Sequence, residues 1–116
     1  MGVAQFRGRA GEDLAAALLA LRGLRVVARN VRLAGVEVDL IAEEGPVQVL
    51  VEVRLRSRAD YGGAAETLDA RKRARLVRAA QALAVGGAAR VRLDVVAVDL
   101  TPDGAAIVHY RNALAG

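Results

Sequence analysis

Two neighbouring segments decide the fold: Val36-Glu37-Val38-Asp39-Leu40-Ile41-Ala42 and Val47-Gln48-Val49-Leu50-Val51-Glu52-Val53-Arg54-Leu55-Arg56. Polar and apolar residues alternate in both segments, which predicts strands. Side chains point to opposite faces of a strand in turn, so each segment divides into two groups. In the second segment, the four valines and Leu55 share a face, opposite Gln48, Leu50, Glu52, Arg54 and Arg56. In the first, we expect Val36, Val38, Leu40 and Ala42 on one side and Glu37, Asp39 and Ile41 on the other.

The turn between the segments sets how their acids meet. A loop around Glu44-Gly45-Pro46 would fold them into an antiparallel hairpin. If Gly45-Pro46 is the loop, Asp39 lies directly opposite Glu52; if Glu44-Gly45 is the loop, the two acids are diagonal neighbours on one face. Like charges placed in this way repel, and each raises the pKa of the other. Oxygen ligands on rigid strands therefore predict a divalent cation, Mg²⁺ or Mn²⁺, at this pair.

A sheet with one solvated face is the simpler explanation for acids that alternate with valines, and for any single acid it is the more frequent one. However, the face of Asp39 and Glu52 also carries Ile41 and Leu50. An apolar pair indicates that this face is partly covered, and covered carboxylates need partners.

The composition bounds the class of protein. A chain of 116 residues predicts a single domain, residues 1–116, with a core of its own. Without an apolar run of membrane-spanning length, a signal peptide or a cysteine, we expect a cytoplasmic protein with no membrane partner. The net charge of +4 and the pI near 10.6 favour a polyanionic partner. Aromatic residues are too scarce for a base-stacking single-strand binder.

The remaining pattern predicts the order α-β-β-β-α-β-β, an α/β domain with a mixed sheet. Glycines at 23 and 86–87 end the two helices, and Thr101-Pro102-Asp103-Gly104 has the composition of a turn. A polar, glycine-containing loop is expected at 57–63. The expected elements are helices at about 8–21 and 66–85, and strands at 24–30, 36–42, 47–56, 90–100 and 105–112.

One residue in each helix has two interpretations. Glu12 shares a side with Leu19 and starts a helix that is apolar nearly throughout 14–21, so it is either a helix-start acid beside the dipole or a functional acid. Lys72 is the only lysine, and it falls within the apolar stripe of the second helix. Either its stem covers apolar surface, or its ammonium is aimed at the acid face of the sheet. The stripe consists of Leu68, Leu76, Ala79 and Leu83.

These residues together resemble the YraN-like family of uncharacterised proteins, which is related to the archaeal Holliday-junction resolvases. The usual motif of that family reads Gly-Glu-Ile-Asp-Leu-Ile-Ala and then Val-Glu-Val-Lys. Here the matching stretches are Glu37-Val38-Asp39-Leu40-Ile41-Ala42 and Val51-Glu52-Val53-Arg54-Leu55-Arg56, with Glu12 on the first helix. The similarity runs over nearly the whole chain. It implies the restriction-endonuclease-like fold, in which helices flank a mixed sheet.

The resemblance also implies a PD-(D/E)xK site. In such a site Asp39 and Glu52 bind Mg²⁺ or Mn²⁺, the backbone carbonyl of Val53 is a further ligand, and Glu12 completes the resolvase-like arrangement.

The sequence departs from the family motif at two positions. Val36 stands where the family usually has Gly, and Arg54 stands where the nuclease lysine belongs. Arginine stays protonated, so Arg54 can offer charge and hydrogen bonds but cannot act as a base. In some enzymes of this fold the lysine has migrated, and Lys72 could supply the amine from the helix.

The leading interpretation is a metal-dependent endonuclease for branched or otherwise structured DNA, with a role in DNA repair or recombination. The first alternative is a non-catalytic nucleic-acid-binding protein of the same fold, which Arg54 favours. The second is a structural or protein-interaction protein in which acids and arginines merely pair, with Glu37 facing Arg54. Resolvase relatives act as dimers, so a homodimer would suit a branched substrate. His109 is expected in a simple hydrogen-bonded position. The candidates for phosphate contacts, each of which is also explained by a solvated surface charge, are Arg56, Arg58, Arg71, Arg73, Arg75 and Arg78.

Overall fold

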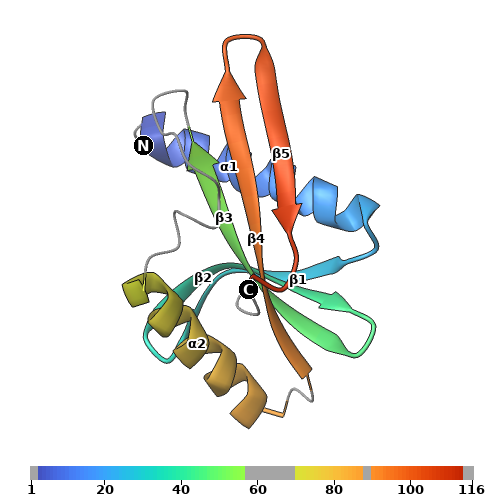
Figure 1. The fold of residues 1–116 in the computed structure, drawn as a ribbon, viewed down its shortest axis with the longest axis vertical. Helices are drawn as coiled ribbons and strands as arrows, with labels where there is room; N and C mark the ends of the chain where they lie inside the picture. Colours follow the sequence, from blue (N-terminus) through green and yellow to red (C-terminus); the bar gives the residue numbers. More distant parts are fainter. Residues whose placement is uncertain (1–2, 57–69, 88–89, 114–116) are drawn as a thin grey trace.

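A computed structural model of the protein describes residues 3–56, 70–87 and 90–113, without the side chains of residues 3–8, 56 and 100. The order α-β-β-β-α-β-β is confirmed (Figure 1). The predicted loop at 57–63 and the predicted start of the second helix lie outside the described residues. The elements are α1 (Val3–Leu21), β1 (Arg25–Leu33), β2 (Val36–Glu44), β3 (Val47–Arg56), α2 (Ala70–Val85), β4 (Arg90–Thr101) and β5 (Gly104–Tyr110).

The five strands form one mixed sheet in the order β1-β2-β3-β4-β5. Strands β3 and β4 are parallel, and the other neighbouring pairs are antiparallel. Parallel neighbours need a crossover, and the connection between β3 and β4 contains α2. The predicted α/β class with a mixed sheet between helices is therefore confirmed.

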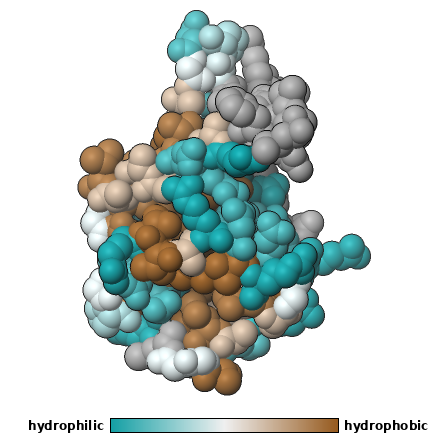
Figure 2. Space-filling model, turned by 180° about the vertical axis from the view of Figure 1, so that it is seen from behind, coloured by the Kyte–Doolittle hydropathy of each residue, from teal (hydrophilic) through white to brown (hydrophobic). Residues whose placement is uncertain are grey.

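The core has two halves, one on each face of the sheet. In β3 the predicted alternation is confirmed, because Val49 and Val51 belong to the half under α1 and Leu50 to the half under α2. Hydrophobic patches lie among hydrophilic ones on the side of the molecule shown in Figure 2. The half under α1 includes Ala15, Leu19, Leu40, Val96 and Val98. The half under α2 includes Val36, Ile41, Leu76, Ala79, Leu93 and Val95.

The predicted grouping of β2 is wrong. Val36 and Val38 pack under α2, whereas Leu40 and Ala42 pack under α1. Two residues that are two positions apart in a regular strand share a face, so β2 must change sides between Val38 and Leu40. The change occurs beside Asn30 of β1, whose φ of 52° departs from strand geometry.

The hairpin turn between β2 and β3 follows the first of the two predicted alternatives. Glu44 pairs with Val47, so Gly45-Pro46 is the loop. Gly45 has a φ of 56°, a conformation that glycine adopts without steric cost.

Helix α1 ends as predicted but begins earlier. Its C-terminus is a Schellman motif, in which the N–H of Leu24 donates to the carbonyl of Leu19 at 2.9 Å and Gly23 has a φ of 87°. Because the helix begins at Val3 instead of near residue 8, Glu12 lies in its middle, and the helix-start interpretation of this acid is wrong.

Helix α1 exposes part of its apolar surface to water, although it is apolar nearly throughout residues 14–21. Leu14 is 39 % exposed and Leu21 is 86 % exposed. The sheet covers a single stripe of this helix, which includes Ala15 and Leu19.

Helix α2 ends before Gly86-Gly87, as predicted, and Gly87 has a φ of 115°. Leu76 and Ala79 form its buried stripe, with Leu83 half-buried beside them, whereas Leu68 lies outside the described residues. In the described part of the chain, neither helix combines the length and the hydropathy that a membrane span requires.

Candidate functional site

The β2–β3 hairpin opens at Asp39. The pairing of the two strands ends at Leu40↔Val51, one position before Asp39 would meet Glu52. Beyond that pair, Oδ2 of Asp39 accepts a hydrogen bond from the backbone N–H of Val53 at 2.8 Å. A carboxylate thus takes the place of a backbone carbonyl, and the strands separate around it.

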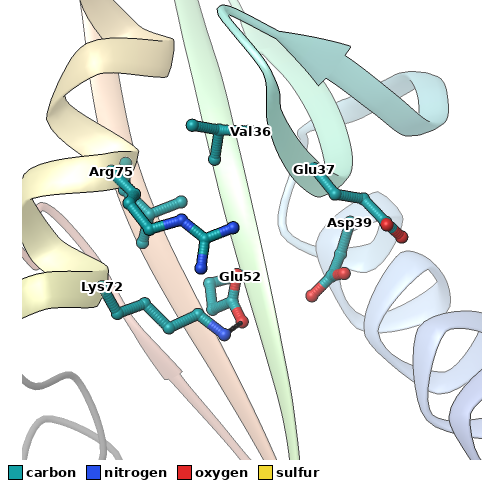
Figure 3. A pocket seen from close by; sticks show the side chains of 7 residues that line it. Val36, Glu37, Asp39, Glu52, Lys72 and Arg75 are labelled. Carbon is teal, nitrogen blue, oxygen red and sulfur yellow. Dashed lines mark ion pairs between the residues drawn. The ribbon is translucent and has the colours of Figure 1, made fainter.

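Glu52 lies next to this opening, on the face of the sheet that α2 covers. Only 4 % of Glu52 is exposed, and its Oε1 atom lies 2.7 Å from Nζ of Lys72 (Figure 3). Nη1 of Arg54 lies 3.9 Å from the same oxygen. The ammonium of Lys72 therefore reaches the acid face of the sheet instead of only covering apolar surface, and Arg54 lies near Glu52 instead of Glu37.

A pocket of about 220 Å³ separates β2 and β3 from α2. Acids come from the strands, and cations come from the helix, so the two kinds of charge face each other across the pocket (Figure 3). Val36, which stands at the family's glycine position, contributes an apolar wall. The lining residues are Val36, Glu37, Asp39, Glu52, Lys72, Arg75 and Leu76.

Asp39 is held in an environment that opposes its charge. Burial, followed by the negative charge of Glu52, raises its pKa from 3.8 to about 6. The hydrogen bond from Val53 and the positive charge of Lys72 lower this pKa, but they do not restore its ordinary value. A cation placed between Asp39 and Glu52 would remove the repulsion between them.

Glu12 approaches the same region from α1. Its Oε1 atom lies 3.4 Å from Nδ2 of Asn30, the residue of β1 with positive φ. Burial, followed by the negative charge of Asp39, raises the pKa of Glu12 above its ordinary value. The hydrogen bond from Asn30 and the positive charge of Arg29 offset only part of this rise. Glu12 is therefore electrostatically coupled to Asp39, although it does not line the pocket.

The pair of side chains proposed from the sequence to hold a metal ion is Asp39 and Glu52, which both line the pocket. Within residues 3–56, 70–87 and 90–113, no three His, Cys, Asp or Glu side chains come close enough together to form a complete ligand set. A site at Asp39 and Glu52 would therefore depend on backbone carbonyls and water for its other ligands. That donor set fits Mg²⁺ or Mn²⁺, which are bound by oxygen and commonly retain several waters.

The predicted phosphate-binding arginines of α2 lie on two sides of the helix. Successive helical residues are rotated by about 100°, so Arg71, Arg75 and Arg78 lie on one side of Lys72 and Arg73 lies on the other. All four are exposed, and Arg75 also lines the pocket. Arg58 and the side chain of Arg56 lie outside what the structure describes.

A second charged cluster lies on the face of the sheet that α1 covers. The sequence did not predict that its residues come together. Asp94, fully buried on β4, accepts hydrogen bonds from Nε and Nη2 of Arg92 at 2.8 and 2.9 Å and from the N–H of Asn112 at 2.9 Å. Nε2 of His109 lies 2.7 Å from Oδ2 of the same carboxylate. The expectation that His109 is hydrogen-bonded is thus confirmed.

Glu44 extends this cluster to the end of β2. It accepts hydrogen bonds from Arg92 at 2.7 Å and from Arg111 at 2.6 and 3.0 Å. Arg111 and then Arg92 lower its pKa to about 2. The alternation of Arg92 and Asp94 along one strand was the available signal, because it places both side chains on one face.

Comparison with known sequences gives the relationship of the chain. The sequence model of the uncharacterised protein family UPF0102 matches residues 11–98. A UPF0102 protein of Sorangium cellulosum is 41 % identical over 112 residues, which cover 91 % of this chain and 78 % of the relative. A UPF0102 protein of Dechloromonas aromatica is 50 % identical over 94 residues, covering 80 % and 78 %. The chain therefore belongs to family UPF0102, the YraN-like family.

Among solved structures, the chain is similar to Pyrococcus furiosus SfsA in complex with Ca²⁺. The identity is 12 %, the TM-score is 0.38, and the match covers 93 % of this chain and 63 % of the other. A likeness this distant carries no argument about the site.

Proposed function

We propose that this UPF0102 protein is a cytoplasmic, metal-dependent endonuclease that acts on branched or otherwise structured DNA. The observation that supports this most is the grouping of Asp39, Glu52 and Lys72 around one pocket, with Nζ of Lys72 2.7 Å from Glu52. Phosphodiester hydrolysis needs acids that hold a metal and cations that stabilise the phosphate, and this pocket supplies both types. A role in DNA repair or recombination would follow from such a substrate.

Asp39, Glu52 and the carbonyl of Val53 would hold Mg²⁺ or Mn²⁺. The N–H and C=O groups of one strand residue point toward the same neighbouring strand. Because the N–H of Val53 donates to Asp39, its carbonyl is directed to the same side of β3. The ion, when bound, would supply an activated water and a positive charge for the scissile phosphate.

The cations of the chain would act on the phosphate itself. Lys72, Arg54 and Arg75 all lie close to the acids. They would stabilise the negative charge that develops on the phosphate oxygens. Lys72 is the only amine that lines the pocket, so it would take over the role of the lysine that Arg54 replaces in the usual motif.

The exposed arginines of α2 would hold the DNA backbone. Arg71, Arg75 and Arg78 form a row along the helix, beside the pocket that Arg75 lines. Contacts of this type fix the position of a nucleic acid without reading its sequence. This suits an enzyme that recognises a branched shape.

A non-catalytic DNA-binding protein is the second candidate, and Arg54 favours it. An arginine at this position cannot accept a proton from water. If the lysine on α2 does not replace that function, the pocket would bind a metal and a phosphate without hydrolysing the ester.

The deciding experiment is a cleavage assay with four-way junction, flap, duplex and single-stranded DNA, with and without Mn²⁺. The proposed nuclease cleaves at least one branched substrate only when the metal is present, and Asp39→Asn and Glu52→Gln abolish this cleavage. Asp13→Asn is the control, because this acid lies on α1 with its side chain 69 % exposed. Salt-sensitive binding of all DNAs without cleavage would favour the second candidate.

A further inference from the structure

The two edge strands of the sheet differ in how they are protected. Strand β1 carries exposed arginines at 25, 29 and 32, a register shift next to Val27, and a positive φ at Asn30. Charges and irregularities of this kind prevent an edge from pairing with another chain. Strand β1 therefore has several of the usual devices against sheet extension.

Strand β5 has none of these devices. From Gly104 to Tyr110 it contains no Asp, Glu, Lys, Arg or Pro, and its pairing with β4 is regular from Thr101↔Gly104 to Val95↔Tyr110. Ala105, Ala106 and Val108 are exposed. In the part of the chain that the structure describes, β4 is the only strand paired with β5, and the hairpin projects beyond α1 (Figure 1).

The charges at the two ends of β5 are opposite. Asp103 precedes the strand, and Arg111 follows it. Both lie four positions from Ile107, the central residue of the strand. An antiparallel copy of β5 centred on Ile107 would therefore bring the turn that contains Asp103 near Arg111 of the partner subunit, whereas a parallel copy would bring like charges together.

We propose that β5 is a homodimer interface, in which the strand pairs antiparallel with β5 of a second copy about a twofold axis at Ile107. The exposed Val108 then lies opposite the exposed Ala106 of the partner subunit, so the pairing covers apolar side chains on both strands. Arg111 also binds Glu44, but its side chain is 47 % exposed and can accept a further acid. The strand is thus complementary to itself in both charge and hydrophobicity.

The dimer would be a continuous ten-stranded sheet. The twofold axis is perpendicular to the sheet, so both copies of α2 stay on one face, and the pocket at Asp39 remains uncovered. Two seven-residue strands form a small interface, so the association should depend on protein concentration. This interface does not rest on the proposed nuclease activity.

Sedimentation of the whole chain over a concentration series tests the proposal, with two exposed edge valines as a matched pair. Val108 is 41 % exposed on β5, and Val27 is 44 % exposed on β1. Val108→Lys should weaken dimerisation at least about tenfold, and Val27→Lys should leave it unchanged. Asp103→Arg should also weaken the dimer, because it brings a positive charge near Arg111 of the partner subunit. A chain that is monomeric at all concentrations, or a dimer that resists Val108→Lys, overturns the proposal.

Crosslinking tests the register, because the chain has no cysteine of its own. Residues directly opposite each other in an antiparallel pair have Cα atoms about 4.5–5.5 Å apart, which a disulfide can bridge. A mixture of Ala106→Cys and Val108→Cys chains should therefore oxidise mainly to the mixed dimer. A mixture of Val27→Cys with either chain should not crosslink. Equal amounts of like and mixed dimers would overturn the register centred on Ile107.

Discussion

Asp39 and Asp94 are aspartates of the same sheet with opposite electrostatic environments. Burial alone would raise the pKa of Asp94, but hydrogen bonds from Arg92, Asn112 and His109 hold it below its ordinary value. Asp39 is half-buried and accepts a hydrogen bond from Val53, yet its pKa is raised to about 6. The fold supplies positive partners for one carboxylate and negative neighbours for the other.

The difference separates a structural acid from a functional one. Arg92 and His109 complete the environment of Asp94, which joins β4 to β5 and to Asn112 after it. Asp39 faces a pocket that also contains Glu37 and Glu52. Perturbed carboxylates in a pocket are candidates for function, whereas a paired carboxylate in a core is explained by stability. The following predictions test this division, from the largest expected effect to the smallest.

Asp94→Asn should destabilise the protein by about 3 kcal/mol, because the substitution leaves Arg92 with less than its full charge compensation in a buried position. The free energy of unfolding from urea titration measures this loss. Asp13→Asn, which removes a largely exposed ion pair with Arg29, should change stability by less than about 1 kcal/mol. Equal effects of the two substitutions would mean that the cluster around Asp94 is not a structural unit.

Cleavage should depend on Lys72 if the pocket is catalytic. Lys72→Ala should reduce the cleavage rate at least about 100-fold, because the pocket loses its amine. Arg54→Lys should raise the rate, since it restores the usual motif. Largely intact cleavage in Lys72→Ala would show that this lysine only neutralises Glu52. If wild type and Arg54→Lys are both inactive but bind Mn²⁺ and junction DNA, the binding protein becomes the better conclusion.

Mn²⁺ affinity should distinguish Asp39 from an acid that lies outside the pocket, Asp13. Asp39→Asn should weaken binding at least about tenfold, because half of the carboxylate pair is lost. Calorimetric titration of wild type, Asp39→Asn and Asp13→Asn measures this effect, and Asp13→Asn should bind like wild type. Identical heats in wild type and Asp39→Asn would remove Asp39 from the site.

Asp39 should also make the stability of the metal-free protein depend on pH. Its folded pKa of about 6 lies above the ordinary 3.8, so the folded state binds the proton more tightly than the unfolded state does. The contribution of Asp39 to stability therefore falls as the pH rises from about 4 to about 6. Asp39→Asn, measured with a chelator present, should be more stable than wild type by about 1 kcal/mol above this pH window. The gain from removing the buried charge is partly offset, because the neutral amide oxygen accepts a weaker hydrogen bond from Val53 than the carboxylate does. A difference that does not vary with pH would contradict the raised pKa.

The smallest expected effect concerns the arginines of α2. Arg75→Glu should weaken DNA binding several-fold and reduce its salt dependence, because Arg75 lies beside the pocket. Arg73→Glu makes the same charge change on the other side of Lys72 and should have less effect. Both should act equally on all DNA sequences, since phosphate contacts carry no base information. Binding curves at several salt concentrations measure both variants. Equal losses of affinity in Arg75→Glu and Arg73→Glu would mean that the DNA does not approach the pocket.

The sequence was sufficient for the order of the elements, but it left two registers open for the hairpin. Glu44-Gly45-Pro46 interrupts the two apolar patterns, so a turn there and the proximity of Asp39 to Glu52 followed from local chemistry. The choice of Gly45-Pro46 as the loop required the strand pairing that the structure shows. Lys72 was conspicuous as the only lysine in an apolar stripe. Its contact with Glu52 required the position of α2 over the sheet, which no local pattern contains.

The errors arose where tertiary contacts override periodicity. Alternation placed Leu40 with Val38, but the side chain of Asp39 captures the N–H of Val53, and β2 changes faces at that point. The early start of α1 was missed because glycine at position 8 is a poor helix residue. The cluster around Asp94 was missed because it joins strands that are distant in sequence.

The bond from the Val53 amide to Asp39 gives the protein a spectroscopic reporter. The resonance of this amide should move when Asp39 gains or loses its proton near pH 6, and again when a cation binds. The amide of Asn112, which donates to Asp94, provides a reference, because that carboxylate stays charged to a lower pH. Two amide signals in a nitrogen–proton correlation spectrum would thus follow the two aspartates separately, without any added label on a side chain.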